Sequence, residues 1–322
     1  MALPSDVTGP APAHDRMHDP PRARIAVVGL GSIGGVAAAC LAAAGRHDIV
    51  ACMRQPQPAP AMRLTLDRPE GTVDVSLPNL TDPAQAEAAD WVLICTKTQQ
   101  THSVAPWLSR LCTPQTRVAV LQNGIDHVTR VAPLVNGAAV LPVIVYYNGE
   151  RLGPDHVRMR RASPNDLVVA DGELGRAFVK LLEGTGLQVL IEQDFVTLLW
   201  RKLLINAVAN PITALTLQRQ AVLRRPDIQD LCHAVLAEAV AVARAEGARV
   251  ADDEAARTIA ALMTFSGALG TSMYFDRLAE RQIEVEALTG ALVAAGERHG
   301  IAMPINRALL ALLRAVNDAA KA

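Results

Sequence analysis

Three polar side chains lie four residues apart in an otherwise apolar stretch of the sequence, and they are the first candidates for chemistry. They are Lys202, Asn206 and Asn210. Residues four apart share one face of a helix, so an ammonium and two amides would point the same way. The rest of the segment is apolar on nearly every side, which is typical of a buried helix, where polar groups need partners. We therefore expect these residues to bind a polar substrate.

Two of these residues also have a purely structural interpretation. Lys202 could extend its aliphatic stem along the protein and place its charge in solvent. Asn210 could end the helix, because it precedes Pro211 and a residue before proline disfavours the helical conformation. The shared face favours a site over either alternative.

A glycine-rich segment near the start of the chain predicts a dinucleotide site. The segment Gly29-Leu30-Gly31-Ser32-Ile33-Gly34 follows a predicted buried strand over 24–28 and opens a predicted helix over 32–45. In this setting glycines allow a tight turn, close approach of a pyrophosphate and close packing of the helix on the strand. The positive end of the helix then meets the phosphates. We expect these six residues to contact the cofactor.

The end of the second predicted strand, 48–53, indicates which dinucleotide is bound. An NAD site has an acidic residue about 20 positions after the glycines, where it holds the ribose hydroxyls. Here the strand ends without an acid and is followed by Arg54, which can pair with a 2′-phosphate. This favours NADP(H) as the cofactor, and the alternative is an arginine that is simply solvated.

The order of predicted elements divides the chain into two parts. Strands and helices alternate up to about residue 192, which predicts an α/β Rossmann-type domain with a mostly parallel sheet over 24–193. Helical patterns then cover the rest, which predicts an all-α domain over 194–322. Residues 1–23 are rich in proline and predict a disordered tail. The further predicted strands are 62–77 (two strands), 91–95, 118–121, 138–147, 167–170 and 187–192, and the further predicted helices are 102–111, 173–185, 194–217, 226–247, 252–268, 282–299 and 303–318.

Composition excludes several classes of function. The 322 residues are half hydrophobic and carry a formal net charge of -1, which gives no reason to expect nucleic acid or a membrane as partner. No stretch approaches the roughly 20 apolar residues of a membrane span. The five cysteines lie apart, without a CxxC pair, so we expect reduced cysteines, no metal site and a cytoplasmic location.

Three groups of residues, in order along the chain, carry a resemblance to a known family. They are Lys97 and Asn123 in loops after predicted strands, the Trp200–Thr213 segment, and a Ser272-Met273…Asp276…Arg281…Glu284 pattern. With the glycine loop they make the chain resemble the ketopantoate reductases (2-dehydropantoate 2-reductases) from about residue 24 to 318. The glycine loop is generic to Rossmann enzymes, whereas the second and third groups are specific.

The resemblance implies a reaction and a role for each matching residue. The reaction is the NADPH-dependent reduction of a 2-oxo acid to a 2-hydroxy acid, with 2-dehydropantoate as the expected substrate. Lys202 would protonate the substrate carbonyl, and Glu284 would lie near that lysine and the nicotinamide ribose. The residues that would hold the substrate or the cofactor are Asn206, Asn210 and Ser272 for the substrate, and Lys97 and Asn123 for both.

The chain departs from the family pattern in three segments, and these departures leave the substrate open. Members often carry an asparagine where this sequence has Leu217-Gln-Arg-Gln220, a Gly-Arg-Pro turn where it has Glu280-Arg281-Gln282, and Ile-Asp where it has Val285-Glu286. One alternative is a reductase of another branched or aromatic 2-oxo acid. Another is a protein that senses NADP(H) without turnover, although such a protein has no use for a carbonyl proton donor. A homodimer is also possible.

Overall fold

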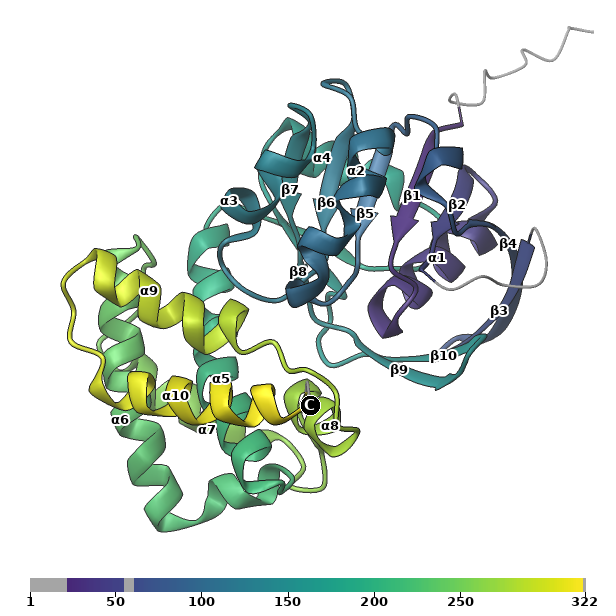
Figure 1. Cartoon of the computed structure of the whole chain (residues 1–322). Coiled ribbons are helices and arrows are strands. Elements are labelled where there is room, and N and C mark those ends of the chain that lie inside the picture. Colours follow the sequence, from purple (N-terminus) through teal and green to yellow (C-terminus); the bar gives the residue numbers. More distant parts are fainter. Residues whose placement is uncertain (1–21, 55–60, 321–322) are drawn as a thin grey trace, which may run out of the picture.

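The computed structural model describes residues 22–54 and 61–320, so the tail predicted for residues 1–23 lies outside the described residues except at its last two positions. Strands and their covering helices make up an α/β lobe (residues 24–192), and helices alone make up a helical lobe (residues 195–319). Figure 1 shows the two lobes side by side, with the sheet in one and the long helices grouped in the other.

A mostly parallel sheet forms the α/β lobe, as predicted. Within the described residues its strands run in the order β7-β6-β5-β1-β2-β4-β3-β10-β9. Neighbouring strands from β7 to β4 are parallel, whereas β3–β4 and β10–β9 are antiparallel. The strands are β1 (Arg24–Val28), β2 (Asp48–Cys52), β3 (Ala61–Arg68), β4 (Gly71–Leu80), β5 (Trp91–Ile94), β6 (Arg117–Val120), β7 (Ala139–Pro142), β9 (Asn148–Gly153) and β10 (His156–Arg160).

The register of the central strands brings three loops to one edge of the sheet. Val28 of β1 pairs with Ile94 of β5, which pairs with Val120 of β6. Because these strands are parallel, the loops that follow them leave the sheet at the same edge. The strand order also reverses at β1, and in open α/β sheets ligands bind at such a reversal. The glycine loop, Lys97 and Asn123 all follow strands at this edge.

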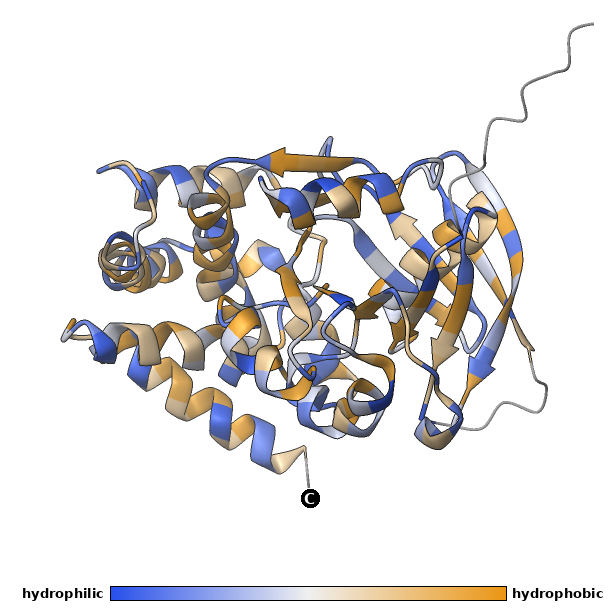
Figure 2. Cartoon of the chain, turned by 90° about the horizontal axis from the view of Figure 1, so that it is seen from above, coloured by the Kyte–Doolittle hydropathy of each residue, from blue (hydrophilic) through white to orange (hydrophobic). Residues whose placement is uncertain are grey.

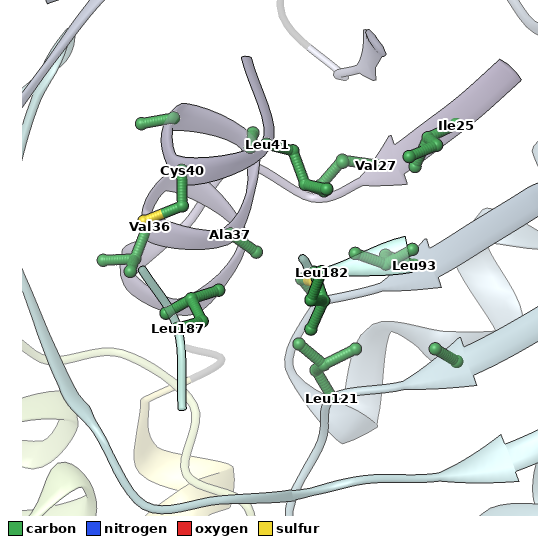
Figure 3. Packing of buried hydrophobic residues seen from close by; sticks show 14 of the residues in the cluster. Ile25, Val27, Val36, Ala37, Cys40, Leu41, Leu93, Leu121, Leu182 and Leu187 are labelled. Carbon is green, nitrogen blue, oxygen red and sulfur yellow. The ribbon is translucent and has the colours of Figure 1, made fainter. Parts of the chain in front are cut away.

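Helix α1 (Ser32–Ala44) packs directly on the sheet because its residues are small and apolar. Residues of the helix and of the strands beneath belong to one buried cluster, in which Leu41 points toward Val27 of β1 (Figure 3). Gly31 occupies the N-cap position of the helix, and Gly45 ends the helix in the left-handed conformation. This packing fixes where the N-terminus of α1, and hence the glycine loop, stands. The other helices of the lobe are α2 (Ala105–Leu111), α3 (His127–Val131) and α4 (Glu173–Leu181), with 3-10 turns η1 (Pro83–Gln85), η2 (Thr98–Val104) and η3 (Ala132–Leu134).

Two sequence-based expectations for the α/β lobe are wrong. The single strand predicted over 138–147 is two strands, because β7 pairs with β6 while β8 (Ile144–Val145) belongs to a second sheet of order β12-β11-β8. The helix predicted over 102–111 is α2, preceded by the 3-10 turn η2 from Thr98. The remaining strands of the second sheet are β11 (Leu167–Ala170) and β12 (Val189–Glu192), both predicted.

The helical lobe has its own core, built around the long helix α5 (Phe195–Thr216). In Figure 2 its helices carry both hydrophobic and hydrophilic residues, as expected where one face of each helix packs inward. Within the described residues, no helix is both long and apolar enough to cross a membrane. The other elements are η4 (Gln220–Arg224), α6 (Pro226–Ala245), α7 (Glu254–Thr264), α8 (Ser272–Leu278), the π-helix η5 (Glu286–Gly290), α9 (Ala291–Arg298) and α10 (Pro304–Ala319).

Tertiary contacts override local sequence signals at two places in this lobe. Helix α5 continues through Pro211 to Thr216, so the interpretation of Asn210 as the end of the helix is wrong. The helix predicted over 282–299 begins only at Glu286, because the preceding segment is irregular where Glu284 bonds to the α/β lobe.

Candidate active site

The glycine loop has the shape that a dinucleotide needs. Gly29 has a φ of 95°, and a Cβ there would lie 2.6 Å from the Thr96 side chain. A Cβ on Gly34 would collide with the Gly29 carbonyl oxygen, so helix and strand are packed too closely for any side chain. A Cβ on Gly31 would meet nothing within 4 Å, and no side chain caps α1 there. The loop therefore leaves a helix N-terminus open to a phosphate group.

Arg54, another predicted cofactor residue of this lobe, lies two positions beyond β2 and is exposed. An exposed guanidinium at the end of the second strand can pair with an anionic group. Together with the open glycine loop, this chemistry fits a dinucleotide cofactor.

A cleft between the two lobes brings several predicted site residues together. Asn123 and Gly124 line it from the loop after β6, and Lys202 and Asn206 line it from α5. The two α5 residues stand one helical turn apart, as their spacing predicts. The cleft therefore combines an ammonium with amides. The remaining lining residues are Gln122, Val143, Ile144, Leu199 and Leu203.

The Lys202 ammonium is held in this cleft by the backbone of the other lobe. Its Nζ donates a hydrogen bond to the Val145 carbonyl oxygen at 2.8 Å and lies 5.9 Å from the centre of the Tyr146 ring. Burial lowers the pKa of Lys202 to about 8, although the negative charge of Glu284 acts to raise it. A lysine in this range can give up a proton near neutral pH.

Glu284 is a buried carboxylate that joins the lobes. It accepts hydrogen bonds from the Thr98 amide and hydroxyl, both at 3.1 Å, and from Asn123 Nδ2 at 2.9 Å. Lys97 Nζ lies 3.5 Å from it. Burial alone would raise the pKa of Glu284, but the Lys97 charge and the hydrogen bonds hold that pKa below its usual value. The carboxylate is therefore ionised and keeps a negative charge beside the cleft.

One residue to which the sequence assigned no role completes this cluster. Buried Asp276 accepts a hydrogen bond from Lys97 Nζ at 2.7 Å, and the Arg281 guanidinium lies 3.1 Å from its other carboxylate oxygen. Burial would lower the pKa of Lys97, but Glu284 and Asp276 together raise it. Lys97 is therefore a charged link between lobes. The sequence did contain a signal for a role of Asp276 at the site, since Asp276 and Arg281 belong to the pattern that also contains Glu284.

A second residue missed by the sequence reasoning is Gln122, which lines the cleft. Its Nε2 donates to the Thr96 carbonyl at 2.9 Å, and its backbone oxygen lies 2.8 Å from Nε2 of buried His127. Gln122 thus ties the loop after β6 to the loop after β5, which carries Lys97. In the sequence, the position of Gln122 directly before Asn123 could have indicated that it belongs to the site.

The other two predicted substrate residues lie differently. Asn210 is only 3% exposed, and its side-chain oxygen has no hydrogen-bond partner within the described residues. Such an orphaned acceptor is costly unless a ligand satisfies it. Ser272 is the exposed first residue of α8, and neither it nor Asn210 is among the residues that line the cleft. Its neighbour Thr271 caps α8 and bonds to Thr213 of α5 at 2.7 Å.

Family models match both lobes. The model described as ketopantoate reductase PanE/ApbA matches residues 25–173, and the model of its C-terminal part matches residues 194–317. The chain belongs to the ketopantoate reductase family. It is accordingly an oxidoreductase. Residues 22–54 and 61–320 contain no group of three or more His, Cys, Asp or Glu side chains able to hold a metal ion.

Individual relatives are similar over nearly their whole length. The 2-dehydropantoate 2-reductase of Mycobacterium tuberculosis is 37% identical over 297 residues, which cover 91% of this chain and 98% of that protein. A crystal structure of a PanE/ApbA family ketopantoate reductase from Ralstonia eutropha has a TM-score of 0.82 at 28% identity, covering 93% and 100% of the two chains. A dimeric ketopantoate reductase from Staphylococcus aureus has a TM-score of 0.80 at 25% identity, covering 92% and 99%.

Proposed function

We propose that this ketopantoate reductase family member reduces 2-dehydropantoate to pantoate with NADPH. The observation that carries the proposal is the Lys202 ammonium in the interlobe cleft, one helical turn from Asn206 and with a pKa lowered by burial. The open glycine loop and Arg54 support the choice of cofactor. The α/β lobe (24–193 as proposed from the sequence) would hold the cofactor, and the helical lobe (194–322) would supply the proton donor.

Lys202 is assigned the role of proton donor. Reduction of a 2-oxo acid places negative charge on the carbonyl oxygen, which a nearby ammonium stabilises and then protonates. A bound nicotinamide supplies the hydride. The Val145 carbonyl holds the Lys202 ammonium in place before the reaction, so little reorganisation is needed when charge develops.

Glu284 and Lys97 are assigned to the electrostatics of the site. The ionised Glu284 keeps the ammonium form of Lys202 more populated than burial alone would allow. Through Asn123 and Thr98 it also fixes the two loops that face the cofactor side of the cleft. Lys97 and Arg281 together balance the charges of Glu284 and Asp276, so the buried carboxylates do not repel an anionic substrate unopposed.

The substrate is assigned to Asn123, Asn206, Asn210 and Ser272 on its polar side. The apolar wall of the cleft suits an alkyl side chain on the 2-oxo acid, which is the kind of group that 2-dehydropantoate carries. The wall consists of Val143, Ile144, Leu199 and Leu203.

A second candidate is the reduction of a different 2-oxo acid. It is favoured by the segment after α5, where members often have an asparagine and this chain has Leu217-Gln-Arg-Gln220. The side-chain oxygen of Gln220 is buried and lacks a partner among the described residues. Assaying NADPH consumption over a panel of 2-oxo acids decides between the candidates. A clear preference for 2-dehydropantoate supports the first, and a preference for another branched or aromatic acid supports the second. NADPH binding without turnover of any acid would contradict both and favour a sensing protein.

We propose a homodimer in the cytoplasm as the working form of the enzyme. The dimeric state of the similar Staphylococcus aureus enzyme supports the first part, and the five buried, unpaired cysteines support the second. Sedimentation equilibrium of the purified protein tests the oligomeric state directly.

Cofactor preference gives one prediction. Arg54→Ala should weaken NADPH binding by about 1–3 kcal/mol, the usual effect of losing a hydrogen bond to a charged group, and should leave NADH binding unchanged. Fluorescence titration of both cofactors measures the effect, and Arg110→Ala on α2, another exposed arginine of the same lobe, is the control. Equal Michaelis constants for NADPH and NADH in the wild type would contradict the assignment.

Asn210 gives a second prediction. Asn210→Ala should raise the Michaelis constant for the oxo acid by about tenfold or more, because a substrate hydrogen bond is lost, while NADPH affinity stays the same. The stability of the free enzyme should not fall, since the lost oxygen has no partner there. Steady-state kinetics and thermal unfolding on one sample test both statements.

Asn306 offers a matched control for that variant. It is also buried in the helical lobe, and its side-chain oxygen likewise lacks a partner among the described residues, but its Nδ2 donates to the Val235 carbonyl and to Glu238. Asn306→Ala should therefore lower the melting temperature without changing the Michaelis constant. If Asn210→Ala behaves like Asn306→Ala, the residue is structural and its substrate role is refuted.

A further inference from the structure

Strand β9 lies against the first turn of α1 (Figure 1), and an arginine on this strand reaches the glycine loop. Arg151 donates from Nη1 to the Leu30 carbonyl at 3.1 Å, from Nε to the Gly153 carbonyl at 3.0 Å, and from Nη2 to the Pro154 carbonyl at 2.7 Å. A planar guanidinium with three fixed acceptors has little freedom. It therefore ties the β9–β10 turn rigidly to the loop between β1 and α1.

Two further contacts press the same segment onto the start of α1. The Tyr147 hydroxyl donates to the Ile33 carbonyl at 2.8 Å. A Cβ on Gly149 would lie 2.5 Å from the Ser32 carbonyl oxygen, so the strand approaches as closely as only a glycine permits. The segment from Tyr147 to Arg151 thus binds one carbonyl before the start of α1, that of Leu30, and one within its first turn, that of Ile33.

The Leu30 contact determines the direction of a neighbouring amide. A trans peptide points its C=O and the following N–H in opposite directions. Because Arg151 holds the Leu30 carbonyl on the β9 side, the Gly31 N–H is directed away from β9. A Cβ on Gly31 would meet nothing within 4 Å, so the backbone there is uncrowded. A charged donor on the carbonyl also polarises the peptide and makes the N–H a stronger donor.

We propose that Arg151 is a positioning residue that orients the Gly31 amide toward the pyrophosphate of the cofactor. It acts through the loop backbone and does not itself bind the cofactor. The inference rests on the dinucleotide site of the proposed function, but not on which 2-oxo acid is reduced.

The test compares two ligands that share the 2′-phosphate but differ in the pyrophosphate. Arg151→Met should raise the dissociation constant of NADPH by about ten- to hundredfold, as for a lost hydrogen bond of a charged group. The dissociation constant of adenosine 2′-monophosphate, which has no pyrophosphate, should not change. Fluorescence titration gives the first value, and competition against NADPH gives the second. At saturating NADPH the turnover number should equal that of the wild type.

Three variants sharpen the comparison. Arg160→Met removes another arginine of the same hairpin, paired with Glu150 at 2.9 Å, and should leave both affinities unchanged. Arg151→Lys keeps the charge but cannot bridge three carbonyls, so it should weaken NADPH much as Arg151→Met does. Gly149→Ala should show the same selective loss, because the added Cβ forces β9 away from Ser32.

The outcomes distinguish a positioning role of Arg151 from a purely structural role. They also distinguish failure of this proposal from failure of the proposed function. A lower melting temperature with wild-type NADPH affinity in Arg151→Met, or wild-type affinity in Arg151→Lys, overturns the proposal. An equal loss of affinity for NADPH and for adenosine 2′-monophosphate in Arg151→Met also overturns the proposal. If Arg151→Met does not fold, Arg151→Lys and Gly149→Ala decide by the same two titrations. Failure of the wild type to turn over any 2-oxo acid would instead refute the proposed reaction and leave these binding measurements intact.

Discussion

Replacing Lys202 by alanine is expected to cut turnover of the 2-oxo acid by about 10²–10⁴, the usual contribution of a general acid. The Nζ of Lys202 is the ammonium that lines the cleft, and the Val145 carbonyl holds it there. The dissociation constant of NADPH should barely move, because the glycine loop, Arg54 and Lys97 lie in the other lobe. Steady-state kinetics and a fluorescence titration of NADPH on the same preparation measure the two quantities.

Two control variants test whether a positive charge at position 202 is sufficient for turnover and whether the loss of an unrelated lysine affects it. Lys202→Arg keeps a positive charge but should not restore the rate, because a guanidinium is too weak an acid to give up its proton near neutral pH. Lys180→Ala removes an exposed lysine from α4 and should leave turnover unchanged. If Lys202→Ala keeps turnover within about threefold of the wild type, the lysine is not the proton donor.

The sequence was sufficient to predict the scaffold of the site wherever a local pattern and the tertiary structure agree. The apolar runs predicted the central parallel strands, and the glycines predicted the turn between β1 and α1. The four-residue spacing on α5 correctly placed Lys202 and Asn206 on one face. The helical pattern over 194–217 also extends past Pro211, and the structure confirms that the helix continues there, against the local preference of Asn210 to end it.

Contacts between distant segments could not be predicted in the same way. Lys97 and Asp276 are 179 positions apart, and nothing in either local sequence specifies that they meet. The irregular segment that carries Glu284 has a sequence compatible with a helix, yet its hydrogen bonds to Thr98 and Asn123 hold it in another conformation. Here a few buried polar contacts between lobes outweigh local helical preference.

The β9–β10 hairpin was missed for a different reason. Strand β9 reads Asn-Gly-Glu-Arg-Leu-Gly, which has neither the alternation nor the β-branched residues of a typical strand. In β10 only Val157 and Met159 point into the core. The hairpin is held instead by its ladder and by side chains such as Arg151, whose acceptors are backbone carbonyls that no sequence pattern identifies.

The pH dependence of turnover should report the ionisation of Lys202. Burial lowers its pKa to about 8, so the ammonium form required for proton donation is present at neutral pH and is lost as the pH rises. The turnover number should therefore be constant below this value and fall about tenfold per pH unit above it, about hundredfold by pH 10. The pKa values of Lys97 and Tyr146 are raised and that of His127 is lowered to about 4, so these neighbours titrate outside this window.

Glu284→Gln provides the test that links this pH profile to Lys202. Because the negative charge of Glu284 raises the lysine pKa, its removal should lower that pKa further and move the falling limb to lower pH. Glutamine keeps the size of the side chain and can still accept hydrogen bonds from Thr98. In Lys202→Ala the alkaline limb should be absent and the residual rate nearly independent of pH. A limb that persists in Lys202→Ala, or that stays in place in Glu284→Gln, would assign the titration to another group and leave Lys202 without its acid role.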